Sequence, residues 1–492
     1  MTETAKKKRG MPSSFTILLA LLAIVAVITV IVSGTSGGAV TAARLSDFCT
    51  APIKGFADAL PVCLFVMILG GFLGMMTETG ALDNGIAVLV QKLKGNEIML
   101  IPVLMLIFSL GGTTYGMCEE TVPFYALLAA TMMAAGFDPM VGAATVLLGA
   151  GCGCLGSTVN PFAVGAAVDA LTGVDIAVNQ SIIIGLGAVL WLVTTVMSIV
   201  FVMNYAKKVK ADKGSTILSM QELKDAEEAH GKAASEVHKE VKLTGRQKGV
   251  LIAFAFTFVV MIVGFIPLAD LNEGVANFFD AGAVYDADGN AVVQGWSALI
   301  TGLPIGQWYF DEASTWFFLM AVLIGIIGGL SEKQIVNTFI TGAADMMSVV
   351  LVIALARGIS VLMANTGLDV FVLDAAANAL AGLSGVIFAP MSFLVYFGLS
   401  FLIPSTSGMA TVSMPIMGPL AVKLGFSPEV MVMIFSAAIG VVNLFTPTSG
   451  AIMGGLALAK IEWTTWLKFA LKLIVALSVV CAIILTVACV LI

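Results

Sequence analysis

Long apolar runs, separated by short polar breaks, occupy most of the chain. Because about 20 apolar residues span a bilayer, the longest runs predict membrane helices. These candidate crossings lie at 15–32, 59–76, 182–203, 250–268, 316–330, 346–363, 386–403 and 467–492. Other apolar stretches are shorter and are interrupted by Gly, Pro and Thr, which is typical of re-entrant or broken helices.

The interrupted stretches occur twice. The first copy carries GGTTYGMCEETVPF from Gly111 and GCLGSTVNPF ending at Phe162. The second copy carries PSTSGMATVSMP from Pro404 and NLFTPTSG ending at Gly450. Matched Gly/Pro-interrupted segments in two halves of a membrane protein are the best sequence indication of a secondary transporter's binding site. The pattern therefore predicts an all-α polytopic membrane protein built from two repeats.

The repeats divide the chain into five parts. We expect a tail with a first helix, repeat one, a polar linker, scaffold helices with an acidic segment, and repeat two; these parts cover 1–49, 50–203, 204–248, 249–339 and 340–492. Each repeat is expected to hold one re-entrant hairpin and one discontinuous helix. The hairpins are placed at about 98–135 and 386–422, and the discontinuous helices at about 139–168 and 428–458.

Composition and charge agree with a membrane protein. The chain is 59% hydrophobic and 11% charged, against roughly 25% charged in a soluble domain. Ten Lys and Arg between residues 207 and 248 predict a cytoplasmic linker, whose mixed charges suit a short solvated helix. The basic residues Lys6 to Arg9 predict a cytoplasmic N-terminus, and the acidic segment 269–314 is expected outside. We expect the bacterial inner membrane as the location.

Several other classes of protein lack their signatures here. The seven cysteines form no C-x-x-C pair, and the two histidines, His230 and His238, lie in the linker. The string Gly151-x-Gly153-x-x-Gly156 matches a dinucleotide fingerprint, but no strand precedes it. There is no Walker A motif, no nucleophile–base arrangement and no basic patch for nucleic acid. We therefore expect no enzyme, no cofactor and no metal centre.

The four interruptions are the candidate binding site. A helix break in a membrane leaves backbone groups without partners, and such breaks persist where they face a cavity or a ligand or are buried in protein. Exposed carbonyls and hydroxyls suit sodium, while half-helix N-termini attract a carboxylate. Packing through small residues is the competing explanation. The candidate substrate-binding residues are Thr113, Thr114, Glu119, Glu120, Ser157, Thr158, Asn160, Arg357, Ser405, Thr406, Ser407, Asn443, Thr446, Thr448 and Ser449. Sodium could bind near Thr113, Asn160, Ser407 and Asn443, with proton coupling as the alternative.

Three charged residues in this set leave alternatives open. Burying the carboxylates of Glu119 and Glu120 in a membrane is costly, so a role in binding or coupling is the default interpretation. A helix cap, or an ion pair with Arg357, is the structural alternative. Arg357 itself could bind a substrate carboxylate or neutralise one of the two glutamates.

The stretch GGTTYGMCEETVPFY, from Gly111 to Tyr125, resembles the YfcC-type family, which groups with the anaerobic C4-dicarboxylate carriers of the ion-transporter superfamily. The resemblance covers nearly the whole chain. It implies inverted repeats, each with a hairpin and a broken helix, and a dimer whose transport domain moves like an elevator. Relatives of this kind carry dicarboxylates, short fatty acids or amino acids.

Charge favours a basic amino acid such as arginine or ornithine as the exchanged substrate. Glu119 and Glu120 would match its cationic side chain, and half-helix N-termini would match its carboxylate. The alternative is a proton- or sodium-coupled carrier of C4-dicarboxylates or other organic anions, in which Arg357 contacts the substrate. The expected partners are this small molecule, the lipid bilayer and a second copy of the chain.

Overall fold

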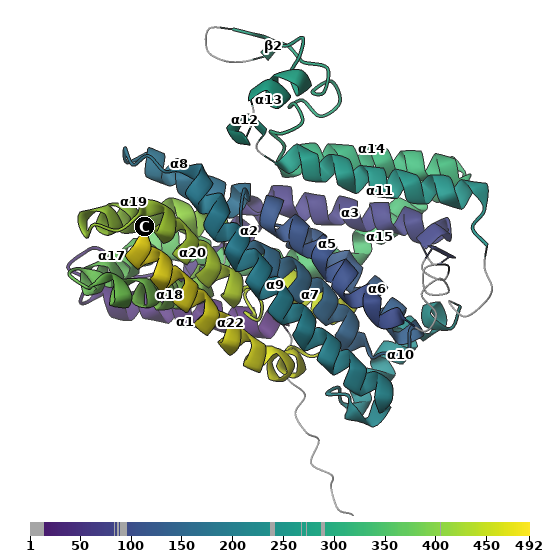
Figure 1. Ribbon diagram of the computed structural model, residues 1–492, viewed down its shortest axis with the longest axis horizontal. Helices are drawn as coiled ribbons and strands as arrows, with labels where there is room; N and C mark the ends of the chain where they lie inside the picture. Colours follow the sequence, from purple (N-terminus) through teal and green to yellow (C-terminus); the bar gives the residue numbers. More distant parts are fainter. Residues whose placement is uncertain are drawn as a thin grey trace, which may run out of the picture.

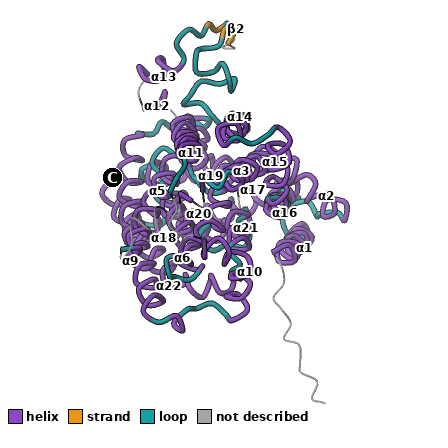
Figure 2. Tube along the Cα trace, turned by 90° about the vertical axis from the view of Figure 1, so that its right-hand side faces the viewer, coloured by secondary structure: helices purple, strands orange, loops and turns teal. Residues whose placement is uncertain are grey.

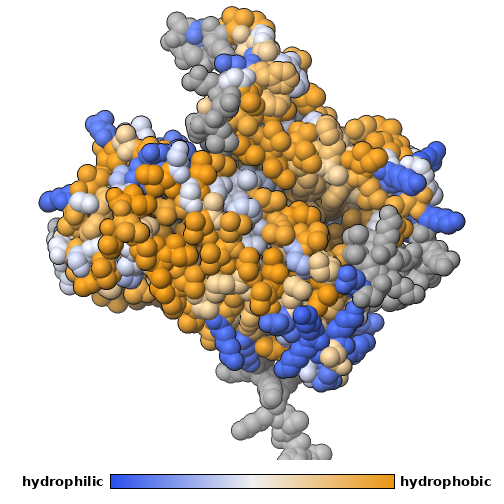
Figure 3. All heavy atoms as spheres, in the orientation of Figure 1, coloured by the Kyte–Doolittle hydropathy of each residue, from blue (hydrophilic) through white to orange (hydrophobic). Residues whose placement is uncertain are grey.

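The computed structural model is almost entirely helical (Figure 1). It describes residues 14–82, 84–85, 88, 96–236, 242–266, 268–271, 273–286, 291–403 and 405–492. Within these ranges, eight helices are long and apolar enough to cross a membrane: 15–33, 60–78, 97–115, 180–211, 245–265, 310–328, 347–366 and 463–491. The predicted all-α polytopic membrane fold is confirmed. Apolar side chains cover most of the face shown in Figure 3, and hydrophilic ones gather near its edges.

Two pairs of helices show the repeat most clearly. Helices α2 (Leu45–Asp58) and α3 (Leu60–Glu78) recur as α15 (Glu332–Asp345) and α16 (Met347–Thr366), with starts 287 positions apart (45 to 332, and 60 to 347). They pair crosswise, α2 with α16 and α15 with α3. Gly55 lies against Gly358 at one crossing and Gly342 against Gly70 at the other, where an added Cβ would strike backbone. The crossings are therefore close helix–helix contacts of the kind that small residues permit.

Each repeat then forms a hairpin. Hairpin one consists of α5 (Leu100–Tyr115), the short η2 (Glu119–Thr121) and α6 (Val122–Ala134). Hairpin two consists of α18 (Gly385–Leu402) and α19 (Thr406–Lys423). The candidate crossing at 386–403 is thus the first arm of a hairpin. These boundaries lie within a few residues of the predicted hairpin ranges.

A broken helix follows each hairpin. In repeat one, α7 (Pro139–Leu155) ends before a π-helical turn, η3 (Pro161–Gly165), that leads into α8 (Ala166–Thr172). In repeat two, α20 (Pro428–Val442) is followed by α21 (Gly450–Leu458). Both long halves begin with a capping residue and a proline: Asp138 accepts from Val141 N–H and Ser427 from Val430 N–H. The next long helices are α9 (Gln180–Ala211) and α22 (Trp463–Leu491).

The linker is docked on the helical body, contrary to the expectation of a solvated connector. Helix α10 (Met220–Glu236) packs on α6 and buries Glu222, Ala226 and His230, spaced four residues apart on one face. Glu222 accepts from Glu462 N–H at 2.9 Å, and His230 Nε2 lies 3.0 Å from the Leu458 carbonyl. The many charges around these three positions hide the buried face in the sequence. The short η4 (Lys213–Ser215) precedes α10.

The remaining elements complete the frame. Helix α1 (Ser14–Ser33) packs on α16 as α14 (Phe310–Gly328) packs on α3, and Figure 2 shows α1, α2 and α16 together at one side. Helix α11 (Gly245–Phe265) lies beside α14, and η1 (Glu97–Met99) and α17 (Leu368–Leu380) are connecting elements. Between α11 and α14, a small segment stands off the body (Figure 1). It holds α12 (Leu268–Leu271), α13 (Glu273–Phe279) and an antiparallel pair of strands, β1 (Val284–Tyr285) and β2 (Ala291–Val293).

Some predicted features lie outside the described residues. These are the basic stretch Lys6 to Arg9, His238 and Pro404.

Candidate functional site

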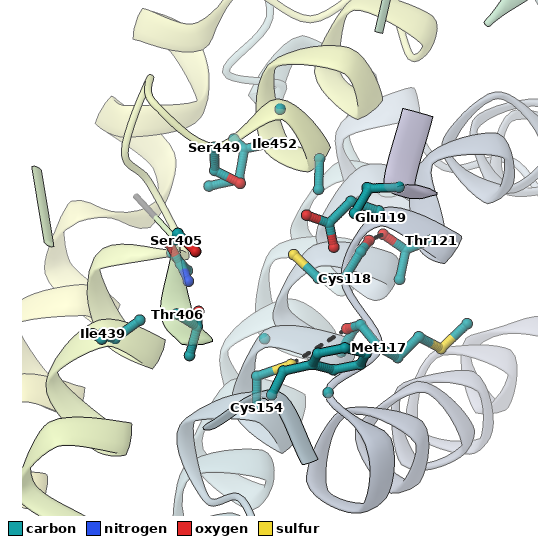
Figure 4. A pocket seen from close by; sticks show the side chains of 18 of the residues that line it. Met117, Cys118, Glu119, Thr121, Cys154, Ser405, Thr406, Ile439, Ser449 and Ile452 are labelled. Atoms are coloured by element: carbon teal, nitrogen blue, oxygen red, sulfur yellow. Dashed lines mark hydrogen bonds between the residues drawn. The ribbon is translucent and has the colours of Figure 1, made fainter. Parts of the chain in front are cut away.

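The tips of the two hairpins enclose one cavity of about 170 Å³. Gly116 to Thr121 line one wall, and Ser405 to Ser407 line the opposite wall together with the start of α21. Figure 4 shows Cys118 and Glu119 on the first wall across from Ser405, Thr406 and Ser449. Arg357 of α16 and the junction of α2 with α3 contribute the frame side. The cavity is small beside the pockets that hold drug-sized ligands, so it suits a small solute.

Ten of the fifteen predicted residues line this cavity. They are Glu119, Glu120, Asn160, Arg357, Ser405, Thr406, Ser407, Asn443, Thr448 and Ser449. The cavity lining does not include the other five, which are Thr113, Thr114, Ser157, Thr158 and Thr446. Both repeats therefore contribute residues to one cavity.

At hairpin one, the chain turns a few residues later than the two candidate threonines. The candidate residues Thr113 and Thr114 lie inside the last turn of α5, and Thr114 donates to the Leu110 carbonyl at 2.6 Å. The chain turns only at Gly116, which adopts a left-handed φ of 79° and faces the Asn160 side chain without room for a Cβ. When the two hairpins are aligned at the 287-residue spacing, Glu119 and Glu120 are the positions equivalent to Thr406 and Ser407.

Thr113 and two more residues outside the cavity lining, Ser157 and Thr158, close the break in repeat one. Thr113 Oγ1 donates to the Gly156 carbonyl at 2.6 Å, and the Thr113 carbonyl accepts from Thr158 N–H at 2.9 Å and from Thr158 Oγ1 at 3.0 Å. Ser157 Oγ donates to the Cys154 carbonyl at 2.6 Å and accepts from Asn160 Nδ2 at 2.9 Å. These side chains satisfy backbone groups that a helix break would leave without partners. In repeat two, Thr446 pairs with the Thr448 hydroxyl at 2.7 Å.

The two adjacent glutamates have different surroundings. Glu120 is 2% exposed, and its Oε2 accepts from Cys118 N–H at 2.9 Å, so it caps the unwound tip. Glu119 is partly exposed and points into the cavity between Cys118 and Thr121 (Figure 4). The geometry therefore makes Glu119 the carboxylate that a solute can reach, while Glu120 shapes the tip.

The opposite wall is uncharged and rich in hydroxyls. Ser405 caps α19 by accepting from Gly408 N–H at 3.1 Å, and Ser449 precedes the first residue of α21. The N-terminal ends of α19 and α21 both face the cavity, and helix N-termini carry partial positive charge. Among the described residues, the Asn443 side chain has no hydrogen-bond partner and remains available to a ligand. Thus, a carboxylate fits this wall and a cation fits the other.

Arg357 makes an ion pair that the sequence did not predict. Its Nε lies 3.0 Å from Asp58 Oδ2, at the end of α2, and the Arg357 side chain is 25% exposed. Among the described residues, Asp58 is the ion-pair partner of Arg357. Neither Glu119 nor Glu120 forms an ion pair with Arg357. Of the two alternatives for Arg357, neutralisation of a hairpin-one glutamate is therefore replaced by pairing within the frame.

Several lining residues were missed. Cys118, Thr121 and Tyr125 belong to the motif that starts at Gly111, so a stricter use of that motif would have included them. Ser436 is 2% exposed, and its hydroxyl has no partner within the described residues. Ser436 is the single polar residue in the apolar run 430–442 and lies seven positions before Asn443. Helical periodicity could therefore have predicted that both face the same side. Other lining residues, such as Phe162, Phe310 and Val62, are apolar and carried none.

The geometry defines a membrane transporter, since two pairs of interrupted helices meet at a polar cavity inside an all-helical membrane fold. The pattern of the DcuC family, the C4-dicarboxylate anaerobic carriers, matches residues 39–490, and the chain belongs to that family. This confirms the resemblance drawn from the motif at Gly111.

Two relatives are 28% identical to the chain. One is an uncharacterized protein of Haemophilus influenzae, aligned over 90% of this chain and 78% of its own length. The other is the "Putative basic amino acid antiporter YfcC" of Escherichia coli, aligned over 84% and 74%. Among solved structures, MtrF of Neisseria gonorrhoeae, from a class of antimetabolite efflux pumps, covers 98% of the chain at 16% identity and a TM-score of 0.45. The YdaH transporter of Alcanivorax borkumensis covers 96% at 15% identity and 0.47.

Proposed function

We propose that the protein is a secondary antiporter of basic amino acids such as arginine and ornithine. The observation that carries this proposal is the division of charge across one cavity. Glu119 faces it from hairpin one, and the hydroxyl-lined N-terminal ends of α19 and α21 face it from repeat two. A solute with a cationic side chain and a carboxylate satisfies both walls at once. The name of the Escherichia coli relative supports the same substrate class.

In this proposal the site works by binding, with no bond made or broken in the solute. The guanidinium or ammonium group of the solute pairs with Glu119, and its carboxylate accepts from Ser405, Thr406 and backbone N–H groups of α19. The hairpins and broken helices move together as an elevator against the frame of α2, α3, α15 and α16. The crosswise pairing of these four helices supports inverted repeats.

The proposal includes a setting in the cell. The protein lies in the bacterial inner membrane as a homodimer, with its N-terminus and the linker in the cytoplasm. The ten basic residues between 207 and 248 support that orientation. A proton or sodium gradient can supply energy when exchange is not balanced.

Counterflow in proteoliposomes tests the substrate. Purified protein is reconstituted into vesicles preloaded with unlabelled ornithine, and external radiolabelled arginine is added with and without a sodium gradient. We expect saturable arginine accumulation that depends on internal ornithine and disappears in empty vesicles. Absence of exchange, from protein that is monodisperse and correctly inserted, contradicts the proposal.

A carrier of C4-dicarboxylates or related anions is the second candidate. Arg357 lines the cavity and binds Asp58 through Nε, which leaves its two Nη nitrogens for a solute carboxylate. The description of the family supports this class as well. Uptake of radiolabelled succinate by the same vesicles, with no arginine signal, would favour this candidate, and Glu119 would then take the coupling proton or sodium.

A further inference from the structure

One face of α2 is polar and exposed although the helix packs inside the membrane frame. Thr50, Lys54 and Asp58 lie four residues apart, so they form one stripe along the helix. The neighbouring exposed face is apolar, with Cys49 and with Ile53 at 74% exposure. A lysine and an aspartate that faced lipid would be strongly disfavoured, so such a stripe is expected to face water or a partner.

The position of the stripe follows from its contacts. Gly55 of α2 packs against Gly358 of the apolar helix α16. Lys54 precedes Gly55 and Asp58 lies one turn after it, so both lie beside α16. Helix α2 also runs into the spanning helix α3 with only Ala59 between them, and Ala59 N–H donates to the Gly55 carbonyl at 3.0 Å.

The stripe ends at the cavity. Asp58 binds Arg357, which lines the cavity, at 3.0 Å. Ala59, which directly follows Asp58, and Val62, in the first turn of α3, line the cavity too. The polar face of α2 is thus continuous with the wall of the candidate binding site.

The other end of the stripe lies on the membrane side away from the linker. Thr41 N–H donates to the Thr366 carbonyl, so the start of α2 lies beside the end of α16. Gln247 of α11 approaches the carbonyls of Thr79 and Gly80, so the end of α3 lies beside the linker. The stripe therefore leads from the membrane side opposite the linker to the cavity.

We propose that the Thr50–Lys54–Asp58 face of α2 is the water-filled path by which the solute reaches the cavity from the side opposite the linker. This inference rests on the proposed function in taking the solute to be charged. The charges along the path alternate in sign, from Lys54 to Asp58 to Arg357 and then Glu119. A zwitterion passes such a series with one of its charged groups always near an opposite charge.

Helix α15 carries the matching face at the same 287-residue spacing: Asn337, Thr341 and Asp345 are all exposed. It starts at the linker side, because Gly328, at the end of α14, lies against Thr79. The same reasoning makes this face the path from the linker side. Its one charge is Asp345, which has no ion-pair partner in the described part of the chain.

Thiol labelling tests the path directly. Single substitutions Thr50→Cys and Lys54→Cys are compared with Ile53→Cys and with native Cys49, which lie on the apolar face of the same helix. A charged, membrane-impermeant methanethiosulfonate is applied from one side to sealed vesicles of known orientation, and modification of each peptide is followed by mass spectrometry. We expect Thr50→Cys and Lys54→Cys to react at least about tenfold faster than either control, because the reagent and the thiolate need water. Thr341→Cys should react from the opposite side.

Two results would overturn the proposal. One is equally slow reaction at Thr50→Cys and Ile53→Cys, which would mean that lipid or protein covers the whole helix. The other is efficient cross-linking of Thr50→Cys between two copies of the chain, which would make the stripe a dimer contact. Gel filtration of each variant shows whether it is folded.

The labelling result is independent of which solute is carried. Rapid labelling without arginine exchange would leave the path standing and remove the proposed substrate. Normal arginine exchange with an unreactive stripe would keep the proposed substrate and remove the path. As a functional measure, Lys54→Gln should raise the KM for solute from that side, and Lys54→Arg should restore it.

Discussion

The breaks in the two repeats are built from similar residues but are completed in different ways. In repeat one, Thr113, Thr158 and Ser157 bond across the break, and Asn160 caps η3 by accepting from Phe162 and Ala163 N–H. In repeat two, no hydrogen bond joins the described residues of the hairpin tip to those of the broken helix. Instead, two tryptophans of α22 donate to the carbonyls of Leu444 and Phe445.

This difference separates structural from ligand-facing polar groups. A polar group already satisfied by protein contributes to stability, and its loss leaves a buried partner unpaired. A polar group that faces a cavity without a partner is available to a solute. Repeat one therefore provides an acidic wall whose break is closed by its own hydrogen bonds. In repeat two, the hydroxyls of Thr406, Ser407 and Ser449 and the amide of Asn443 line the cavity without a partner among the described residues. The following predictions test that division.

The largest effect is expected at the acidic tip. In the proposed function, replacing Glu119 with Gln removes the charge that meets the solute cation, and loss of one partner of a buried charge pair typically costs about 2–5 kcal/mol. We expect at least about a 30-fold loss in kcat/KM for arginine exchange. Glu120→Gln is the matched control, because Gln can still accept from Cys118 N–H through its amide oxygen; it should retain most activity. Initial exchange rates in proteoliposomes measure both variants. Equal losses in the two variants would contradict the assignment.

The asparagines of the two breaks give the next comparison. Asn160→Ala removes a cap that accepts two backbone N–H groups, so we expect a loss of about 1–2 kcal/mol in unfolding free energy. Asn443→Ala removes a side chain with no partner among the described residues, so stability should hold while the KM for solute rises. Thermal unfolding in detergent and exchange kinetics separate the two outcomes. A destabilised Asn443→Ala with unchanged KM would show that repeat two is also closed by its side chains.

These contrasts mark what the sequence could and could not predict. Apolar run length and paired interruptions predicted the membrane fold, both hairpins and both broken helices, because hydrophobicity and helix-breaking residues act locally. Ten of the candidate residues line the cavity for the same reason. Which hydroxyls are used up by bonds across a break depends on tertiary contacts. Thr113 and Thr406 look alike in sequence, and only the structure places one inside α5 and the other at a helix start.

The ion pair between distant parts of the chain could not be predicted from the sequence either. Asp58 and Arg357 are separated by almost 300 positions, and nothing local in either segment indicates the other. The buried face of α10 was hidden because charged neighbours dominate its composition, whereas three buried positions define that face among the side chains that the structure describes. For α10, the information lies in the four-residue spacing of the buried positions, which average composition does not report.

The smallest predicted effect concerns α10, which joins the two walls by packing on α6 of repeat one and on the turn after α21 of repeat two. Burial lowers the pKa of His230 below its usual 6.5, and the nearby Lys460 adds to the shift, while the hydrogen bond to the Leu458 carbonyl opposes it. Because the docked state disfavours the protonated ring, docking is fully stable above about pH 6.5 and weakens as the pH falls through the lowered pKa.

We expect amide hydrogen exchange in 220–236 to accelerate between pH 7 and pH 5, after correction for the intrinsic pH dependence of exchange. His230→Gln should abolish this acceleration, because the amide can still donate to the Leu458 carbonyl but does not titrate. If the variant and the native protein accelerate equally, the titrating group lies elsewhere. If neither does, α10 is held by Glu222 and its apolar contacts alone, and the two walls stay coupled at every pH in that range.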